Sequence, residues 1–225
     1  EEEKVNKAFE SADSIVEVEL INNRIVPNSM ETRGAIASYN EETSKYELRC
    51  SSQGVHSIRD RVSEVLNIEA KDLRVITTDV GGGFGMKLFN YPEYICSLFA
   101  SKKVGRPVKW ISERTEAFLS DTHGRDHVTK AKMALDKNGI FLGIKINTTA
   151  NLGAYLSNFA IFIPTLAGTA MLAGCYKTPS IYVNVLGVFT NTPAIDAYRG
   201  AGRPEASYVI ERLVDIAGIK TGLGP

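Results

Sequence analysis

The 225-residue sequence predicts an α+β fold, in which mixed or antiparallel sheets pack against helices. Three observations lead to this prediction. Apolar and polar residues alternate in several short segments, as they do in half-buried strands, and an Asn-Gly turn joins two of these segments. Other segments carry apolar residues three and four positions apart, which is the spacing of an amphipathic helix. Strand-like and helix-like segments are interleaved, and no internal repeat is present.

The strand-like segments begin near the N-terminus. Residues 14–20 alternate apolar and charged side chains, and residues 30–37 and 46–50 predict two strands joined by a polar hairpin. The clearest hairpin joins residues 128–135 to residues 140–149 through the Asn-Gly turn. Further strands are predicted at residues 73–78, 107–111 and 181–190.

Three helices are predicted, at residues 57–66, 94–104 and 206–217. The second has apolar residues on most turns and should be mostly buried, and Gly105 ends it. Residues 1–13 are polar and acidic, which suits a linker or a short helix. Residues 151–174 are rich in Gly, Ala, Pro and aromatic residues without a clean period and receive no assignment.

Composition narrows the class of protein. Lys plus Arg number 26 and Asp plus Glu also number 26, so net charge gives no reason to expect nucleic acid or an anionic membrane as a partner. No apolar run approaches the roughly 20 residues of a membrane span. Three cysteines without a CxxC pair argue against a zinc or iron–sulfur site and suit a reducing, cytoplasmic compartment. Cys96 and Cys175 are expected to be small buried residues rather than nucleophiles.

A glycine loop follows the predicted strand at residues 73–78. Its sequence, Val80-Gly81-Gly82-Gly83-Phe84-Gly85-Met86-Lys87, fits neither a Walker A loop nor a dinucleotide fingerprint. A glycine-rich turn between a strand and a helix nevertheless offers backbone N–H groups to a phosphate or another polar group. The alternative is a tight structural turn, and the loop by itself favours neither.

A second loop precedes the last predicted helix and reads Asp196-Ala197-Tyr198-Arg199-Gly200-Ala201-Gly202-Arg203-Pro204-Glu205. Pro204 suits the first helical position, and Glu205 favours the positive end of a helix. Arg199 and Arg203 would make a positive, donor-rich anion site at a helix N-terminus. Alternatively, both arginines pair with surface carboxylates.

His123 and His127 suggest a metal pair, since they lie four residues apart. That spacing places two histidines on one face only in a helix, whereas Gly124 and the strand pattern that follows predict a loop entering a strand. Structural hydrogen bonding is therefore the expected role of both histidines.

The two loops together resemble the paired signatures of the molybdenum hydroxylases, the family of xanthine dehydrogenase, aldehyde oxidase and the large subunit of aerobic carbon monoxide dehydrogenase. Supporting stretches agree in order and spacing: Asn23-Arg24, Met30-Glu31-Thr32-Arg33, Gly105-Arg106-Pro107-Val108-Lys109-Trp110, Asp121-Thr122-His123-Gly124-Arg125-Asp126, Asn151-Leu152-Gly153-Ala154-Tyr155 and Val188-Phe189-Thr190-Asn191-Thr192. The resemblance runs from about Val5 to Ala217. It implies a first molybdopterin-binding domain at residues 14–217, with residues 1–13 as a linker from an upstream domain and residues 218–225 as a truncated tail.

The resemblance also implies site residues. The cofactor-binding residues would be Gly82, Gly83, Phe84, Gly85, Arg199 and Asn23. In the family the glycine loop lies against the pterin and the molybdenum ligands, and the arginine that matches Arg199 sits beside the oxo group of the metal. Molybdenum would be held through the cofactor near Phe84 and Arg199, with no direct protein ligand. Asn23 replaces a glutamine that often precedes the arginine matching Arg24, and its reach is shorter.

The implied reaction is hydroxylation of a carbon centre with water as the oxygen source. Electrons would pass to 2Fe-2S and FAD groups on a small and a medium partner subunit, and the cofactor would be molybdopterin, in its plain or cytosine dinucleotide form. The family's base is a glutamate in a GxGE-like motif, which this sequence lacks. The chain is therefore expected to contain no catalytic residue, to need the remainder of a large subunit, and to be inactive alone.

Three departures from the family bear on the small-molecule substrate. Leu88 replaces a glutamate and Ala201 a phenylalanine of the purine-oxidising members, so an aldehyde or N-heterocycle is expected instead. Gly200 replaces the cysteine that holds copper in carbon monoxide dehydrogenases. Two rival hypotheses remain: a non-enzymatic nucleotide- or phosphate-binding module, and a degenerate fragment that folds but binds nothing.

Overall fold

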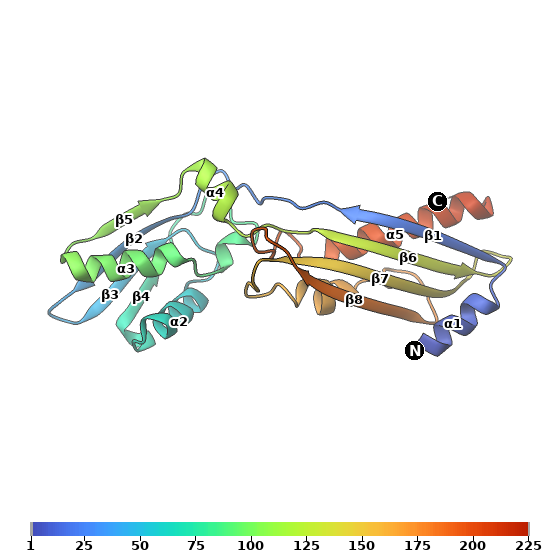
Figure 1. Cartoon of the computed structure of the whole chain (residues 1–225), viewed down its shortest axis with the longest axis horizontal. Helices are drawn as coiled ribbons and strands as arrows, with labels where there is room; N and C mark the ends of the chain where they lie inside the picture. Colours follow the sequence, from blue (N-terminus) through green and yellow to red (C-terminus); the bar gives the residue numbers. More distant parts are fainter. Residues whose placement is uncertain (1, 225) are drawn as a thin grey trace. The chain divides into compact units, whose positions relative to one another are not determined.

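The computed structural model describes residues 2–224, which form two compact units (Figure 1). The terminal unit comprises residues 2–25 and 123–224, and the inserted unit comprises residues 26–122. The predicted domain at residues 14–217 thus contains two units, a division that the sequence pattern does not reveal. In the described part of the chain, no helix combines the length and the apolar character that a membrane span requires.

The terminal unit is built on a four-stranded sheet in the order β1-β6-β7-β8. Its strands are β1 (Ser14–Asn22), β6 (His127–Leu135), β7 (Phe141–Gly153) and β8 (Ile181–Phe189). β1 pairs with β6 and β6 with β7 in antiparallel register, whereas β7 and β8 are parallel. The sheet is therefore mixed, as predicted.

The turn between β6 and β7 forms as the sequence predicts. Gly139 adopts a φ of 80°, a conformation that glycine reaches at little cost. The Asp136 carboxylate accepts hydrogen bonds from the amides of Asn138 and Ile140, both at 2.8 Å. Local turn chemistry thus sets the register of this hairpin.

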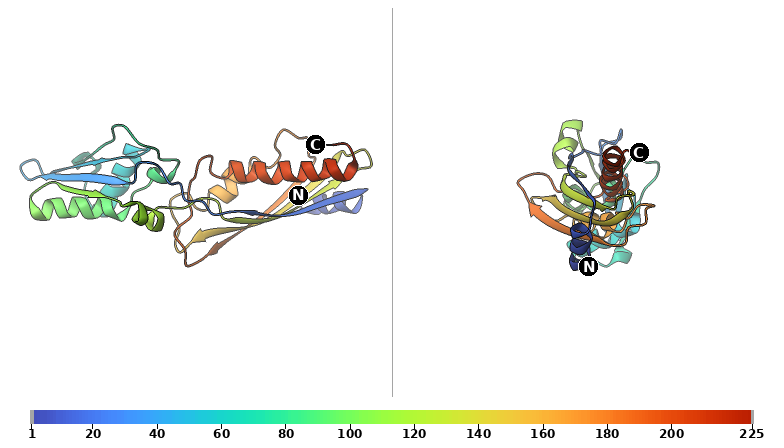
Figure 2. Two further views of the ribbon diagram at one scale, coloured as in Figure 1. Left: turned by 90° about the horizontal axis from the view of Figure 1, so that it is seen from above. Right: turned by 90° about the vertical axis from the view of Figure 1, so that its right-hand side faces the viewer.

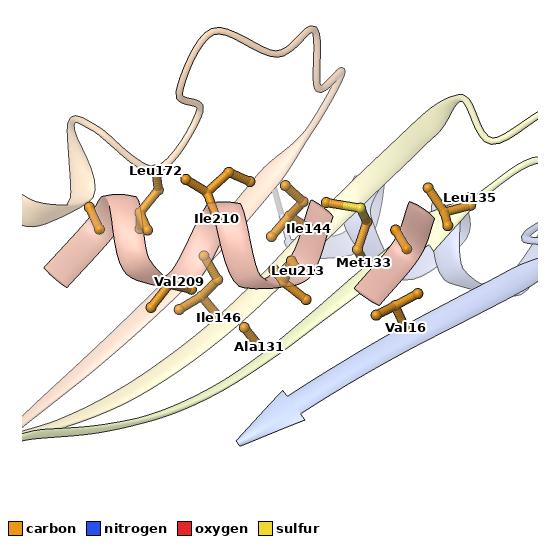
Figure 3. Packing of buried hydrophobic residues seen from close by; sticks show 12 residues of the cluster. Val16, Ala131, Met133, Leu135, Ile144, Ile146, Leu172, Val209, Ile210 and Leu213 are labelled. Carbon is orange, nitrogen blue, oxygen red and sulfur yellow. The ribbon is translucent and has the colours of Figure 1, made fainter. Parts of the chain in front are cut away.

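Helix α5 (Arg203–Thr221) covers one face of the sheet (Figure 2). Its predicted apolar face is confirmed: Leu213 is completely buried and Ile210 nearly so, against Met133, Ile144 and Ile146 of the strands (Figure 3). Burying one such side chain contributes about 1.5–3 kcal/mol.

Helix α1 (Glu2–Glu10) packs on β7 and β8, and its Val5 side chain is completely buried. Lys145 lies between Ile144 and Ile146, whose side chains face α5, and it donates hydrogen bonds to Glu2 and Asn6 of α1. Because neighbouring strand residues point to opposite faces, α1 and α5 cover different faces of the sheet. Of the two interpretations of residues 1–13, the short helix agrees with this packing. α5 extends to Thr221, beyond the predicted boundary at residue 217.

The inserted unit has a second four-stranded sheet, in the order β4-β3-β2-β5. Its strands are β2 (Gly34–Asn40), β3 (Lys45–Cys50), β4 (Leu73–Ile76) and β5 (Val108–Ile111). β3 and β4 are parallel and the other pairs antiparallel. Its helices and 3-10 turns are α2 (Val55–Leu66), η1 (Ala70–Asp72), η2 (Met86–Leu88), α3 (Pro92–Val104) and α4 (Arg114–Ser120).

Two expectations about burial are wrong. Only one side of α3 is buried, at Tyr94, Ser97, Leu98 and Ser101, while Phe99 is 56% exposed. Cys96 and Cys175 are exposed rather than buried. Cys96 lies on the exposed side of α3. Cys175 lies in the turn that follows Leu172, before β8, and few other residues cover it. An apolar composition predicts that a helix is buried but does not say on how many sides.

Candidate functional site

The glycine loop, residues 80–87, lies in the inserted unit and ends in η2. Three of its residues have positive φ angles: Gly82 at 97°, Phe84 at 53° and Gly85 at 105°. Glycine adopts such angles freely, whereas a residue with a Cβ atom loses about 1–2 kcal/mol. Phe84 is therefore held against its backbone preference, which is a common property of residues at functional sites.

Glu31 joins the two ends of the glycine loop. Its carboxylate accepts the amide of Gly81 and the ammonium of Lys87, both at 2.8 Å. The Lys87 side chain is completely buried, whereas that of Glu31 is 42% exposed. Partial burial raises the pKa of the Glu31 carboxyl, but the hydrogen bonds from Lys87 and Gly81 and the charge of Lys87 outweigh it, so the pKa lies below its usual value.

Gln53 supports the middle of the glycine loop. Its side-chain oxygen accepts a hydrogen bond from the backbone N–H of Gly85 at 2.9 Å, and the backbone N–H of Gln53 donates to the carbonyl of Lys87 at 3.0 Å. A Cβ atom on Gly83 would lie only 2.4 Å from the same Gln53 oxygen. Gly83 is therefore required by this close approach.

Two amides of the glycine loop are available to a ligand. Among residues 2–224, nothing accepts a hydrogen bond from the N–H of Gly82 or of Gly83. Gly83 is buried, and a buried amide without an acceptor is costly unless a ligand or water supplies one. Phe84 is 40% exposed, and Leu88 is half-buried. The loop thus has the donors that an anionic or polar group needs.

The arginine loop, residues 196–205, lies in the terminal unit and leads into α5. Like the glycine loop, it has three residues with positive φ angles, and here they are consecutive: Gly200 at 95°, Ala201 at 36° and Gly202 at 88°. Pro204 occupies the second rather than the first helical position, since α5 begins at Arg203. Asp196 is buried at the start of the loop, and its burial raises its pKa despite hydrogen bonds from neighbouring amides.

The π-helix η3 (Ile163–Ala167) lies directly against Gly202. A Cβ atom there would be 2.5 Å from the carbonyl oxygen of Ile163 and 2.8 Å from the amide nitrogen of Gly168. No residue in the described chain accepts a hydrogen bond from the N–H of Gly200 or of Gly202. The second loop therefore shares with the first a close backbone approach and two available amides.

Arg125 holds the backbone of the arginine loop through hydrogen bonds. Its guanidinium donates to the carbonyl oxygens of Tyr198 at 3.0 Å and of Arg199 at 2.9 Å, and to the Glu205 carboxylate at 3.0 Å. The side chains of Arg125 and Glu205 are both only 7% exposed. This buried pair fixes the backbone of Arg199, whose side chain is exposed.

Asp126 supports the segment that contains Asn23. Its carboxylate accepts Arg24 Nε at 2.8 Å and Asn151 Nδ2 at 2.9 Å, and Arg24 also donates to the hydroxyl of Thr192 at 2.5 Å. Asn23 is exposed, and its side chain bonds to no residue that the structure describes. Because Arg125 and Asp126 are adjacent, the structure brings the Asn23 and Arg199 segments together at one end of the sheet.

The two histidines of this segment lie in different local settings. His123 is buried, with its amide donating to the carbonyl of Ala194 and its carbonyl accepting the amide of Asp196. His127 begins β6, and burial lowers its pKa below the usual value. Among the described residues, no group of three or more His, Cys, Asp or Glu side chains could hold a metal ion. The expectation of structural hydrogen bonding is confirmed for the backbone of His123.

Sequence reasoning missed the residues between these histidines. Arg125 and Asp126 hold two segments of the candidate site, whereas in the sequence they served only as part of the stretch at residues 121–126 that supports the family resemblance. Their positive φ angles, 65° and 72°, mark a strained turn that no propensity predicts. Arg203, by contrast, is exposed and donates to the carbonyl of Gly200 at 3.1 Å.

Comparisons with known proteins identify the family to which this chain belongs. A family model described as a molybdopterin cofactor-binding domain matches residues 1–225. The carbon monoxide dehydrogenase large chain of Hydrogenophaga pseudoflava is 35% identical over 205 residues, which are 89% of this chain and 25% of that protein. The 6-hydroxypseudooxynicotine dehydrogenase complex subunit gamma of Paenarthrobacter nicotinovorans is 29% identical, over 97% of this chain and 27% of that protein.

The structure of quinoline 2-oxidoreductase from Pseudomonas putida 86 has the same fold. It superimposes with a TM-score of 0.92 at 32% sequence identity, covering 98% of this chain and 28% of that one. The α+β prediction is thereby confirmed. The chain spans about a quarter of the length of these relatives.

Proposed function

The chain belongs to the molybdopterin cofactor-binding domain family, and from this premise we propose that its two loops bind the cofactor of a molybdenum hydroxylase. The observation that carries the proposal is the set of four available amides, on Gly82, Gly83, Gly200 and Gly202. Their N–H groups and the exposed Arg199 suit the anionic oxygens of a molybdopterin, whether in its plain or cytosine dinucleotide form. Phe84, exposed in the glycine loop, and Asn23, exposed in the terminal unit, are the other proposed contacts.

The residues present fit such a group. Only glycine fits at Gly83 and Gly202, which lie against Gln53 and η3, and this packing holds each loop in a conformation whose free amides have no acceptor in the described chain. When bound, molybdopterin supplies redox chemistry at molybdenum. The chain's own part is to hold it: amides and the fixed Arg199 cation stabilise negative charge on its oxygens and orient it.

We infer that the substrate is an aldehyde or an N-heterocycle, hydroxylated with water as the oxygen donor. Leu88 is half-buried beside the glycine loop, and Ala201 lies within the arginine loop. Neither side chain offers the carboxylate or the aromatic wall that a purine would need. Gly200 likewise gives no thiolate for copper.

We infer that the full reaction needs groups outside these 225 residues. The described chain has no glutamate in a GxGE-like segment and no cluster of cysteines, so the base and the electron carriers must come from elsewhere. A remaining part of the large subunit, a 2Fe-2S subunit and an FAD subunit are the proposed partners. The three free cysteines fit a cytoplasmic setting.

The test is to purify the chain within the protein that its source produces and to measure molybdenum by mass spectrometry and pterin by fluorescence. We expect both in equal amounts. Gly83→Val should reduce the content of both several-fold, because the new side chain displaces Gln53 and closes the glycine loop. Arg61→Met is the control, since that exposed side chain lies in α2, outside both loops, and pairs only with Glu64.

The outcomes separate the rival hypotheses. Absence of molybdenum and pterin from the intact protein would refute the proposal. A retained nucleotide with no molybdopterin would instead support a non-enzymatic nucleotide-binding module. Oxidation of aldehydes or heterocycles by the molybdenum-containing protein, without oxidation of carbon monoxide, would support the substrate class.

A further inference from the structure

A small, partly open cavity lies beneath the arginine loop in the terminal unit. Its volume is about 30 Å³, and its polar side chains are those of His127, Thr129, Thr148, Thr169 and Glu205. Apolar side chains of the sheet and of α5, such as Ile146 and Val209, form the remaining walls. A buried water needs roughly 10–15 Å³ of such space and two to four polar partners. The cavity therefore has room for one or two water molecules.

One polar atom of a residue that lines this cavity has no partner among the described residues. Glu205 Oε1 accepts a hydrogen bond from Arg125 at 3.0 Å, but Glu205 Oε2 is buried and bonds to no described residue. The Glu205 residue is only 6% exposed. Leaving a buried carboxylate oxygen without a donor is costly, so a donor is expected at this position.

The other polar groups of the cavity could bind the same donor. The hydroxyls of Thr129 and Thr148 lie 3.0 Å apart and bond to each other, which leaves acceptor capacity on both. The imidazole of His127 is buried and has no hydrogen bond to another described side chain. Its burial lowers its pKa and so favours the neutral ring, which has one donor and one acceptor nitrogen.

We infer that this cavity is an internal hydration site, in which one or two waters bridge Glu205 Oε2 to the Thr129–Thr148 pair and to His127. Water suits the site better than a cation, because Arg125 already balances the Glu205 charge. The bound water completes the hydrogen bonding of the carboxylate that holds Arg125. Arg125 in turn fixes the carbonyls of Tyr198 and Arg199, so the hydration site is part of the support of the arginine loop.

A high-resolution crystal structure of the chain tests this inference first. We expect density for one or two waters in the cavity, one of them within hydrogen-bonding distance of Glu205 Oε2. Xenon bound in a dry cavity would overturn the inference, because only apolar cavities stay empty of water. An anomalous rubidium peak there after a rubidium chloride soak would also overturn it, in favour of a cation site.

Oxygen-17 relaxation dispersion in solution provides the second test. Thr148→Val removes one hydroxyl from the cavity without touching the Arg125–Glu205 pair, and we expect it to lose at least one long-lived water. Thr149→Val is the matched control, since Thr149 is exposed on the opposite face of β7 and should leave the number of waters unchanged. An equal number in both variants and the unmodified chain would overturn the inference. Neither test depends on molybdopterin binding, so its failure is distinguishable from failure of the proposed function.

Discussion

The glycine loop and the arginine loop are each held by an ion pair, and the two pairs differ in how deeply they are buried. Each contains three positive φ angles and two amides without an acceptor in the described chain. Lys87 of the glycine loop is completely buried, but its partner Glu31 is 42% exposed. In the arginine loop both members, Arg125 and Glu205, are only 7% exposed. The comparison shows that the cost of breaking a pair depends on the burial of the member that remains.

The largest effect is expected at Arg125. Arg125→Met leaves the Glu205 carboxylate buried and unpaired and frees the carbonyls of Tyr198 and Arg199. Removing one partner of a buried pair costs about 3–5 kcal/mol, and urea denaturation should show a loss of that size. Arg203→Met is the control and should change the unfolding free energy by less than about 0.5 kcal/mol, as surface substitutions do. Similar losses for the two variants would show that burial of Glu205 does not decide the cost.

At the glycine loop, removing Glu31 and removing Lys87 should lower the free energy of unfolding by different amounts. Glu31→Gln removes the charge that balances the completely buried Lys87 and should cost about 2–4 kcal/mol. Lys87→Met keeps the apolar stem of the side chain, and water can solvate the exposed side of Glu31, so the loss should stay below about 1 kcal/mol. Urea denaturation of both variants measures the difference. A greater loss for Lys87→Met would contradict the comparison.

The smallest expected effect is a dependence of the free energy of unfolding on pH, caused by His127 in the terminal unit. The folded-state pKa of His127 is lowered by burial, so the unfolded chain binds a proton at pH values where the folded chain does not. The free energy of unfolding should therefore be highest above about pH 6.5 and decrease as the pH falls, by at most about 1.4 kcal/mol per pH unit for one proton. His127→Gln should flatten this dependence. His56→Gln, at an exposed histidine, should leave it in place, and an unchanged slope in His127→Gln would refute the assignment.

The order of strands and helices was largely predictable, because each depends on residues close together in the sequence. The hairpin of β6 and β7 follows from Asn138-Gly139, and the buried face of α5 follows from the spacing of Ile210 and Leu213. Exposure was less predictable. The two cysteines and the outer side of α3 are exposed because the chain around them leaves one side of each element uncovered.

The two loops follow from the amino-acid sequence alone, since consecutive glycines make a backbone that can adopt positive φ angles and approach a ligand. The family to which these loops belong follows from the sequence as well. The ion pairs that hold the loops depend on the folded chain, because Glu31 and Lys87 are 56 residues apart in the sequence and Arg125 and Glu205 are 80 apart. Local patterns carry no information on such pairs: which charge meets which, and how deeply both are buried, depends on the packing of segments distant in sequence.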